Sequence, residues 1–307
     1  MLWPATLIGA GAGWALASIP GALLGGLLGQ LLDRRLRLES WRGLLARLRG
    51  RAVNDEDDLL FQLLGYLAKS GGRVDGAVQP CGVGIFVWTT LLAYNPGKVA
   101  GSPQGWADFW DVKKFPGKRG LRWGAKYSLE FALMADGVAP KDVYQTLATP
   151  AGVERAFRKL DELKPYIHWW KSGQDPVRDL ADGTVVMSSA YNGRIAAAQA
   201  EKQRLAMVWS GGVYDFDFWA LPVGVWKKQL AEEFIRFASQ PEQQKAFAEN
   251  IAYGPANRKA VGLLDPQVAA NLPTAPQNMQ NAVGMNVAFW AEHGEALEQR
   301  FQNWAKR

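Results

Sequence analysis

The chain has 307 residues, a net charge of +6 and an ordinary apolar content, which is long enough for two globular units with packed cores. Its single cysteine, Cys81, excludes an internal disulfide, and the two histidines, His168 and His293, argue against a multi-histidine metal site and leave few candidate bases for catalysis. We therefore expect a protein that is not an enzyme and holds no metal or cofactor. The positive charge is concentrated in seven arginines between Asp33 and Arg51, without a recognisable nucleic-acid-binding module, so no nucleic-acid partner is expected.

The first 32 residues predict a transmembrane anchor. Leu2 to Leu32 contains no charged residue, which is sufficient for a membrane span, and Asp33-Arg34-Arg35 follows it. A cleavable signal would place its basic residues before the apolar core, and arginines after a span favour a cytoplasmic location for the remainder of the chain. Gly21, Gly25 and Gly29 would form one helix face suited to helix pairing, although glycine is also simply frequent in membrane helices.

Residues 33–77 form a second predicted segment, basic at its start and helical at its end. Asn54 can cap a helix whose leucines at 60, 63, 64 and 67 follow a helical repeat that ends at Gly71-Gly72. The run 59–75, behind a glycine-rich span, resembles the start of a membrane-anchored DnaJ-like co-chaperone with a TerB-like domain. The resemblance covers residues 1–77 and does not include the His-Pro-Asp tripeptide of a J-domain.

Residues 78–307 alternate predicted helices and strands, which indicates an α/β fold. Thr149-Pro150 predicts a helix start, with an apolar stripe that continues to Leu163 before Pro165. Strands are predicted at 185–187, ahead of a turn at Asn192-Gly193, and at 205–209, ahead of Gly211-Gly212. Ser239 to Glu242 has the spacing of a capping box and predicts a helix that closes near Gly254-Pro255.

The segment 214–219 predicts a strand with two carboxylates on one face. Because side chains alternate along a strand, Asp215, Asp217 and Trp219 should share a face. Three interpretations remain open: a solvated edge, a site for a cationic ligand among aromatic rings, or a catalytic carboxylate pair. Nearby segments supply no nucleophile and base for the third. His168, in a Tyr-Ile-His-Trp-Trp run, is expected to be packed or hydrogen-bonded rather than to act as a base.

Several segments in the same order resemble the spermidine/putrescine-binding proteins of bacterial ABC transporters. They are 84–90 with 92–95, 105–111, 115–120, 183–193, 216–222, 251–257 and 289–295. The resemblance implies a two-lobed periplasmic binding protein fold of type II, with a small cationic solute held in the cleft and delivered to an ABC permease of the inner membrane. The first half of lobe one has no counterpart in the chain, so this lobe is expected to be incomplete.

The resemblance also implies the ligand-binding residues. Asp217 matches the family's carboxylate after the glycine turn, Tyr191 matches the aromatic residue before Asn-Gly, and Tyr253 matches the tyrosine before Pro-Ala-Asn. The full predicted set is Asp217, Tyr191, Tyr253, Asp215, Trp88 and Tyr127. Asp215 stands where the polyamine binders have an aromatic residue, and Gly124 and Tyr127 stand where they have an acidic cluster, so another amine or small solute is also possible.

Two functions are thus compared. The first is a polyamine-binding component of an ABC transporter, periplasmic and tethered by residues 2–32, although the charge order of the anchor favours a cytoplasmic C-terminus. The second is a membrane-anchored scaffold or co-chaperone-like protein, or a non-functional product of a fusion near residue 77. The location of the C-terminus distinguishes them, because a binding protein must meet its solute outside the inner membrane.

Overall fold

The computed structural model describes residues 78–79, 82–221 and 226–307. The anchor predicted for 1–32, the segment 33–77 and Cys81 lie outside these ranges. None of the helices in the described ranges combines the length and the hydropathy of a membrane span.

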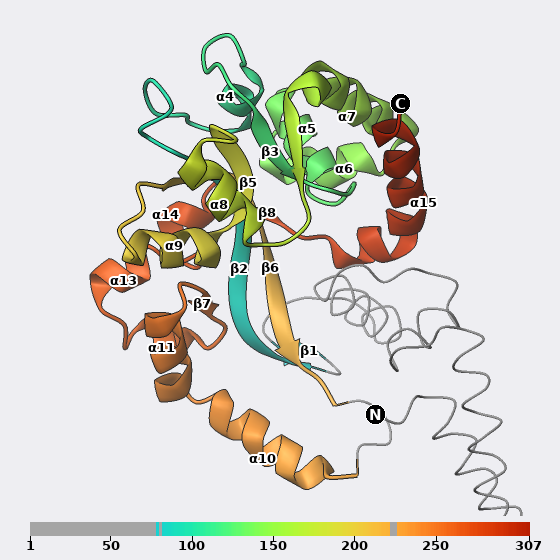
Figure 1. The fold of residues 1–307 in the computed structure, drawn as a ribbon. Helices are drawn as coiled ribbons and strands as arrows, with labels where there is room; N and C mark the ends of the chain where they lie inside the picture. Colours follow the sequence, from blue (N-terminus) through green and yellow to red (C-terminus); the bar gives the residue numbers. More distant parts are fainter. Residues whose placement is uncertain (1–77, 80–81, 222–225) are drawn as a thin grey trace, which may run out of the picture. The chain divides into compact units, whose positions relative to one another are not determined.

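One mixed sheet organises the described residues (Figure 1). Its strand order is β4-β3-β5-β2-β6-β8, and β1 and β7 pair with β2 beside this path. Strand β3 is parallel to β4 and β5, whereas β2 is antiparallel to both β5 and β6. The strands are β1 (Val78–Gln79), β2 (Gly82–Tyr94), β3 (Arg119–Arg122), β4 (Ile167–Trp170), β5 (Met187–Tyr191), β6 (Ala206–Trp219), β7 (Gly254–Pro255) and β8 (Val283–Gly284).

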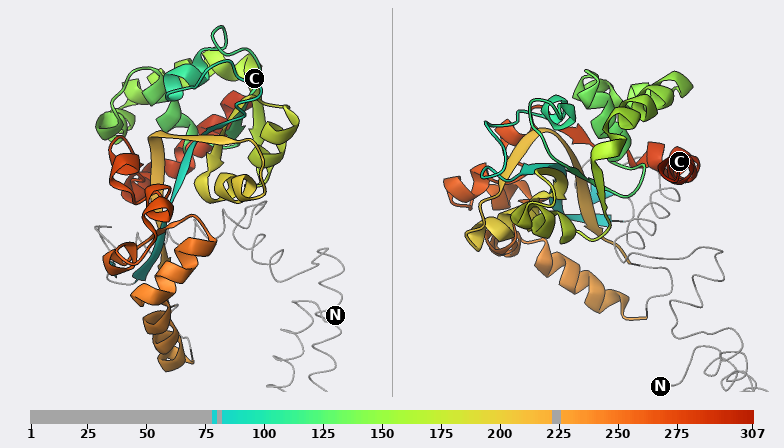
Figure 2. Two further views of the ribbon diagram at one scale, coloured as in Figure 1. Left: turned by 90° about the vertical axis from the view of Figure 1, so that its left-hand side faces the viewer. Right: turned by 45° about the horizontal axis from the view of Figure 1, so that its top comes forward.

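The long strands β2 and β6 run through two lobes. Thr90 to Tyr94 of β2 pair with β5, whereas Phe86 and Val87 pair with β7 and Val83 pairs with β1. Figures 1 and 2 show β3 to β5 near one end of these strands and β7, α10 and α11 near the other. The larger lobe contains β3 to β5 with α4 (Trp106–Trp110), α5 (Ser128–Ala135), η1 (Pro140–Asp142), α6 (Val143–Leu147), α7 (Pro150–Leu163), η2 (Lys164–Tyr166), α8 (Asp175–Asp182), α9 (Asn192–Ala200) and α15 (Val287–Ala305). The smaller lobe contains β1 and β7 with α10 (Lys228–Ala238), α11 (Pro241–Asn250), α12 (Arg258–Val261) and α13 (Pro266–Ala270), and α14 (Pro276–Met279) follows them.

Helix α7 confirms the start and the stripe predicted from the sequence. The Thr149 hydroxyl accepts a hydrogen bond from the Gly152 amide at 3.0 Å, and Pro150 occupies the first helical position. Ala156, Phe157, Leu160 and Leu163 are buried along one side. This is a capped amphipathic helix that ends before Pro165 because proline cannot continue it.

Five local predictions were wrong in detail. The strand expected at 185–187 begins only at Met187, and Asn192-Gly193 opens helix α9 instead of a turn. The strand expected to stop at Trp209 continues through Gly211-Gly212 to Trp219, because a register shift between Thr90 and Leu92 of β2 accommodates the glycines. Ser239 ends α10, and its hydroxyl is buried without a partner in the described structure, so the capping box is absent. Helix α11 ends at Asn250, and Gly254-Pro255 forms β7.

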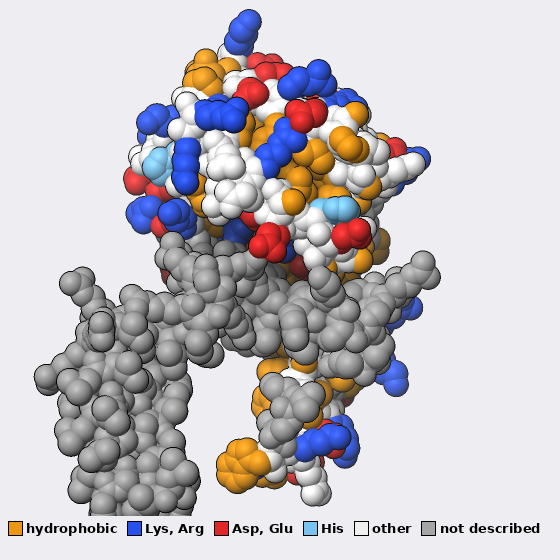
Figure 3. All heavy atoms as spheres, turned by 90° about the vertical axis from the view of Figure 1, so that its right-hand side faces the viewer, with side chains coloured by type: hydrophobic (Ala, Val, Ile, Leu, Met, Phe, Trp, Pro, Cys, Tyr) orange, Lys and Arg blue, Asp and Glu red, His pale blue; other side chains and the backbone are white. Residues whose placement is uncertain are grey.

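The two lobes differ in how completely they are packed. The larger lobe has a core that includes Leu91, Leu180, Val185 and Ile195. Helix α10 of the smaller lobe has no buried residue, and its Leu230, Phe234 and Phe237 are 52–58% exposed. Figure 3 shows hydrophobic side chains together with some charged ones at the visible surface of this lobe, and hydrophobic and charged side chains mixed over the larger lobe.

Candidate functional site

The pairing of β2 with β6 places three of the predicted residues together. Trp88 stands opposite Asp215 and Phe86 opposite Asp217 in the antiparallel register. Residues two apart in a strand share a face, so the indole and both carboxylates lie on the same side of the sheet. The Trp88 indole N–H donates a hydrogen bond to Asp217 Oδ1 at 3.1 Å. The strand and the shared face of Asp215 and Asp217 are therefore as predicted.

Aromatic rings from the larger lobe surround Trp88. Tyr191, at the end of β5, lies opposite Thr90 of β2, and its ring meets the Trp88 ring at 5.3 Å and 87°. The Tyr127 ring lies 6.3 Å from the Trp88 ring. On its other side Tyr191 contacts the Trp170 ring at 5.6 Å. Edge-to-face packing of this kind fixes the rings and forms a rigid aromatic wall.

Tyr253 reaches the same region from the smaller lobe. It directly precedes β7, which pairs with Phe86 and Val87. Its ring stacks on Phe86 at 4.9 Å and 27°. Tyr253 thus joins the group through Phe86, and all six predicted residues lie in one connected region.

Asp215 has an unusual protonation behaviour. Burial raises the pKa of its carboxyl to about 7, and the nearby charge of Asp217 acts in the same direction. The Phe216 amide, which donates to Asp215 Oδ1 at 2.8 Å, and the charge of Lys126 oppose this rise. Near neutral pH a neighbouring charge can therefore shift Asp215 between its neutral and its ionised form.

Two cations, Lys126 and Arg122, accompany these carboxylates, and the sequence reasoning missed both. Burial lowers the pKa of Lys126, and the charge of Asp215 counteracts this effect. Arg122 is buried at the end of β3, and its charge acts on both Lys126 and Tyr127. The available signal was their position. Arg122 ends β3 and Lys126 follows it; β3 is parallel to its neighbours, and sites gather at the carboxyl ends of such strands.

The turn that carries Lys126 is tied to the last helix. Glu298 of α15 accepts hydrogen bonds from the backbone amides of Ala125 and Lys126 at 3.0 and 3.2 Å. The Lys126 ammonium lies 5.7 Å from the centre of the Trp290 ring, also on α15. Helix α15 therefore positions the cationic side of the site.

Tyr127 is held in a strained conformation at the start of α5. Its φ angle is 72°, which is rare for a residue with a side chain, and such strain is often found at functional sites. The side chain is 2% exposed, and its hydroxyl has no hydrogen-bond partner in the described structure. Burial raises the pKa of this hydroxyl far above its usual range, so it stays a neutral hydrogen-bond donor.

Glu130 lies behind the site on α5, fully buried. Its Oε1 accepts hydrogen bonds from the Tyr144 hydroxyl at 2.9 Å and from the Trp290 indole at 2.8 Å. Its Oε2 has no partner among the described residues, and burial raises the pKa of the carboxyl from 4.5 to about 7. No sequence pattern singled out Glu130.

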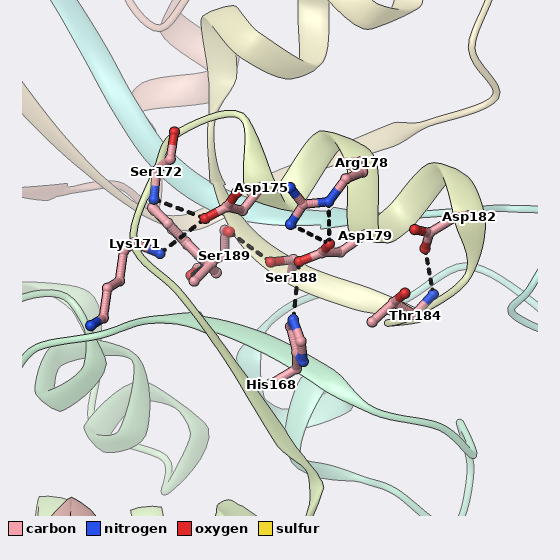
Figure 4. Close-up of polar contacts among 11 residues, drawn as sticks. His168, Lys171, Ser172, Asp175, Arg178, Asp179, Asp182, Thr184, Ser188 and Ser189 are labelled. Atoms are coloured by element: carbon pink, nitrogen blue, oxygen red, sulfur yellow. Dashed lines mark hydrogen bonds and ion pairs between the residues drawn. The ribbon is translucent and has the colours of Figure 1, made fainter.

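His168, which was expected to be packed or hydrogen-bonded, lies close to a carboxylate. Its Nε2 lies 3.3 Å from Asp179 Oδ2, and Arg178 donates to Asp179 Oδ1 at 2.9 and 3.0 Å (Figure 4). The imidazole thus lies beside the ion pair of Arg178 with the buried Asp179 of α8. In the described ranges no group of three or more histidine, cysteine, aspartate or glutamate residues could hold a metal ion.

Comparison with known proteins identifies the family. Residues 39–276 match the bacterial extracellular solute-binding protein family. The chain is 56% identical over 234 residues to a gamma-aminobutyric acid (GABA)-binding protein of Pseudomonas aeruginosa PAO1. The aligned region covers 76% of this chain and 66% of that protein. It is 24% identical over 212 residues to a putrescine-binding periplasmic protein of Escherichia coli K12. That aligned region covers 61% of this chain and 54% of the relative. The chain thus spans less than two thirds of the length of either relative.

A solved structure supports the same fold. An ABC transporter substrate-binding protein from Bradyrhizobium japonicum has a TM-score of 0.72 and 31% identity, with 84% of this chain and 92% of that chain covered. The two-lobed α/β fold implied by the resemblance is therefore correct. The family match begins at residue 39, within the segment 33–77, and so gives no support to a fusion of two families near residue 77. The chain belongs to the bacterial extracellular solute-binding protein family.

Proposed function

We propose that the protein is the solute-binding component of an ABC transporter. It captures a small solute between its lobes, outside the cytoplasmic membrane, and delivers it to a permease. Family membership and the likeness to an ABC transporter substrate-binding protein support this role. The six residues predicted from the sequence would line the site: Asp217, Tyr191, Tyr253, Asp215, Trp88 and Tyr127.

The solute is a small amino acid with well-separated charges, of which GABA is the type. The observation that carries this choice is the presence of both signs of charge: Asp215 and Asp217 would hold the ammonium, and Lys126 with Arg122 the carboxylate. The rings of Trp88 and the two tyrosines would cover the methylene chain. The 56% identical relative is named as a GABA-binding protein.

A polyamine is the second candidate. The paired carboxylates Asp215 and Asp217 favour it, and one relative is named as a putrescine-binding protein. A diamine, however, would bring a second ammonium group toward Lys126 and Arg122, and like charges in a partly buried site repel each other. The cationic side of the site is the feature that separates the two candidates.

Calorimetry on the full chain tests the choice. GABA, putrescine, spermidine, butylamine and butyrate are titrated into the wild type and into Asp217→Asn, which removes the charge but keeps an oxygen for the Trp88 indole. We expect GABA to bind and Asp217→Asn to weaken it at least about 30-fold, the scale for losing one partner of a buried charge pair.

Two further variants sharpen this experiment. Lys126→Gln should weaken GABA but not butylamine, which has no carboxylate. Asp265→Asn is the control, because an asparagine can replace this exposed cap of α13. Tight putrescine binding without GABA binding would establish the second candidate, and no heat for any of these compounds would refute both.

A further inference from the structure

The first two residues of α9 connect the two lobes. The Asn192 side chain is completely buried, and its Oδ1 accepts a hydrogen bond from the Thr89 amide of β2 at 3.0 Å. Its Nδ2 donates to the Ala252 carbonyl at 2.5 Å. Ala252 lies in the smaller lobe, directly before Tyr253 and β7, whereas α9 belongs to the larger lobe. One buried amide therefore links both lobes and the long strand that passes through them.

Gly193 makes the second connection. A Cβ atom at this position would lie 2.5 Å from Cε1 and 2.9 Å from Cζ of Tyr253. The tyrosine ring thus rests directly against the α9 backbone, while it also stacks on Phe86. The backbone of Gly193 has an ordinary conformation that other residues could adopt. A glycine is therefore needed here because of the close approach of Tyr253, not because of the backbone angles.

Both connections lie at the edge of the candidate site. Asn192 follows Tyr191, and Ala252 precedes Tyr253, so each lobe contributes one site tyrosine next to its side of the link. Binding proteins of this architecture open and close about their connecting strands. Contacts made only in the closed arrangement raise the population that can bind solute, and hence the apparent affinity.

We propose that Asn192 and Gly193 form an interlobe latch that sets the affinity for the solute without touching it. Asn192 acts through Ala252, and Gly193 acts through the position of the Tyr253 ring. The latch serves the proposed solute-binding function, but its geometry does not depend on which solute binds. Both residues are positioning residues.

The first test uses the full chain without solute. Small-angle scattering should show a larger radius of gyration for Gly193→Ala, because the added methyl group displaces Tyr253. Gly262→Ala is the matched control: it lies in the smaller lobe, where the nearest atom to a new Cβ, the Lys259 carbonyl oxygen, is 3.6 Å away. Equal scattering of the wild type and Gly193→Ala would overturn the proposal for Gly193.

Hydrogen exchange at Thr89 isolates the contribution of Asn192. Asn192→Asp keeps the acceptor for the Thr89 amide but loses the donor to Ala252, whereas Asn192→Ala loses both. We expect the Thr89 amide to stay protected in Asn192→Asp and to exchange faster in Asn192→Ala, with larger radii in both. An unchanged radius in Asn192→Asp would show that the bond to Ala252 does not hold the lobes together.

The second test measures GABA binding. Gly193→Ala should weaken the affinity roughly tenfold or more, mainly through faster dissociation, and Gly262→Ala should leave it unchanged. In a Tyr253→Ala background the Gly193→Ala change should have little further effect, since its target ring is gone. Equal losses in both backgrounds would refute the action through Tyr253. A wild type that binds no GABA would contradict the proposed solute, while scattering and exchange would still decide the latch.

Discussion

The buried carboxyl of Glu130 should impose a measurable pH dependence on stability. The change to study is Glu130→Gln, which keeps an oxygen to accept from the Tyr144 hydroxyl and the Trp290 indole. The new amide nitrogen takes the place of Oε2, which has no partner in the described structure. The shape of the side chain is thus conserved while its ionisation is removed.

The magnitude can be worked from the pKa of Glu130, which burial raises from 4.5 to about 7. Between these values the folded state binds more protons than the unfolded state, so the stability of the wild type falls as pH rises through this window and levels off above it. A shift of this size corresponds to about 3 kcal/mol. Glutamine cannot ionise, so the free energy of unfolding of Glu130→Gln relative to the wild type should rise by about 3 kcal/mol between pH 4 and pH 8.

Urea unfolding of both proteins at several pH values measures this difference. Other titrating groups, including Asp215, are common to both proteins, and a constant cost of the buried amide shifts the whole curve without changing its slope. Glu154→Gln serves as a control, for which the change in relative stability with pH should have the opposite sign. Arg300 lies 2.8 Å from this exposed carboxylate and lowers its pKa, whereas burial raises that of Glu130. A pH-independent difference between Glu130→Gln and the wild type would refute the reasoning.

Three further outcomes are expected. GABA affinity should weaken as pH falls below 7, by at most about tenfold per unit, because protonation of Asp215 removes the charge that meets the ammonium; equal calorimetric affinities at pH 6 and 8 would contradict this. Phe234→Lys should reduce self-association in light scattering, since it interrupts the exposed apolar face of α10, whereas Glu233→Lys on the same helix should not. Thr149→Ala should cost about 1 kcal/mol in urea unfolding by removing the cap of α7, and Thr149→Ser should restore it.

Local patterns predicted much of the fold correctly where one physical effect dominates. Thr149-Pro150 satisfies the free amides of a helix start, and the stripe to Leu163 follows the helical period, so α7 needed no tertiary information. The alternation at 214–219 likewise predicted a strand with Asp215 and Asp217 on one face. Both features depend on residues close in sequence.

The errors occur where distant segments decide the local structure. Asn192-Gly193 has the composition of a tight turn, but Asn192 bonds to Thr89 and Ala252, and Gly193 accommodates Tyr253. Gly211-Gly212 would end an isolated strand, yet pairing with β2 carries β6 past them. Asn192 is 103 residues from Thr89 and 60 residues from Ala252 along the chain, and a single sequence does not display such contacts.

The candidate site shows the same division for its chemistry. The family resemblance pointed to Asp217, Tyr191 and Tyr253 by position, and the structure brings them into one region with Trp88. The ligand class, however, depends on the balance of charge around these residues. Lys126 and Arg122 come from a different segment than the carboxylates, at and just after the end of β3, and the charge of Lys126 acts on Asp215.

That charge balance explains why a likeness to polyamine-binding proteins does not settle the solute. Carboxylates alone would favour a dication. In the proposed site the charge of Lys126 acts on Asp215, and a zwitterion would match both signs of charge. Burial raises the pKa of Asp215 to about 7, and a bound cation would favour its ionised form. Under the proposed function, replacing Lys126 in the turn after β3 while leaving Asp215 and Asp217 in place is therefore expected to shift the preference toward a dication.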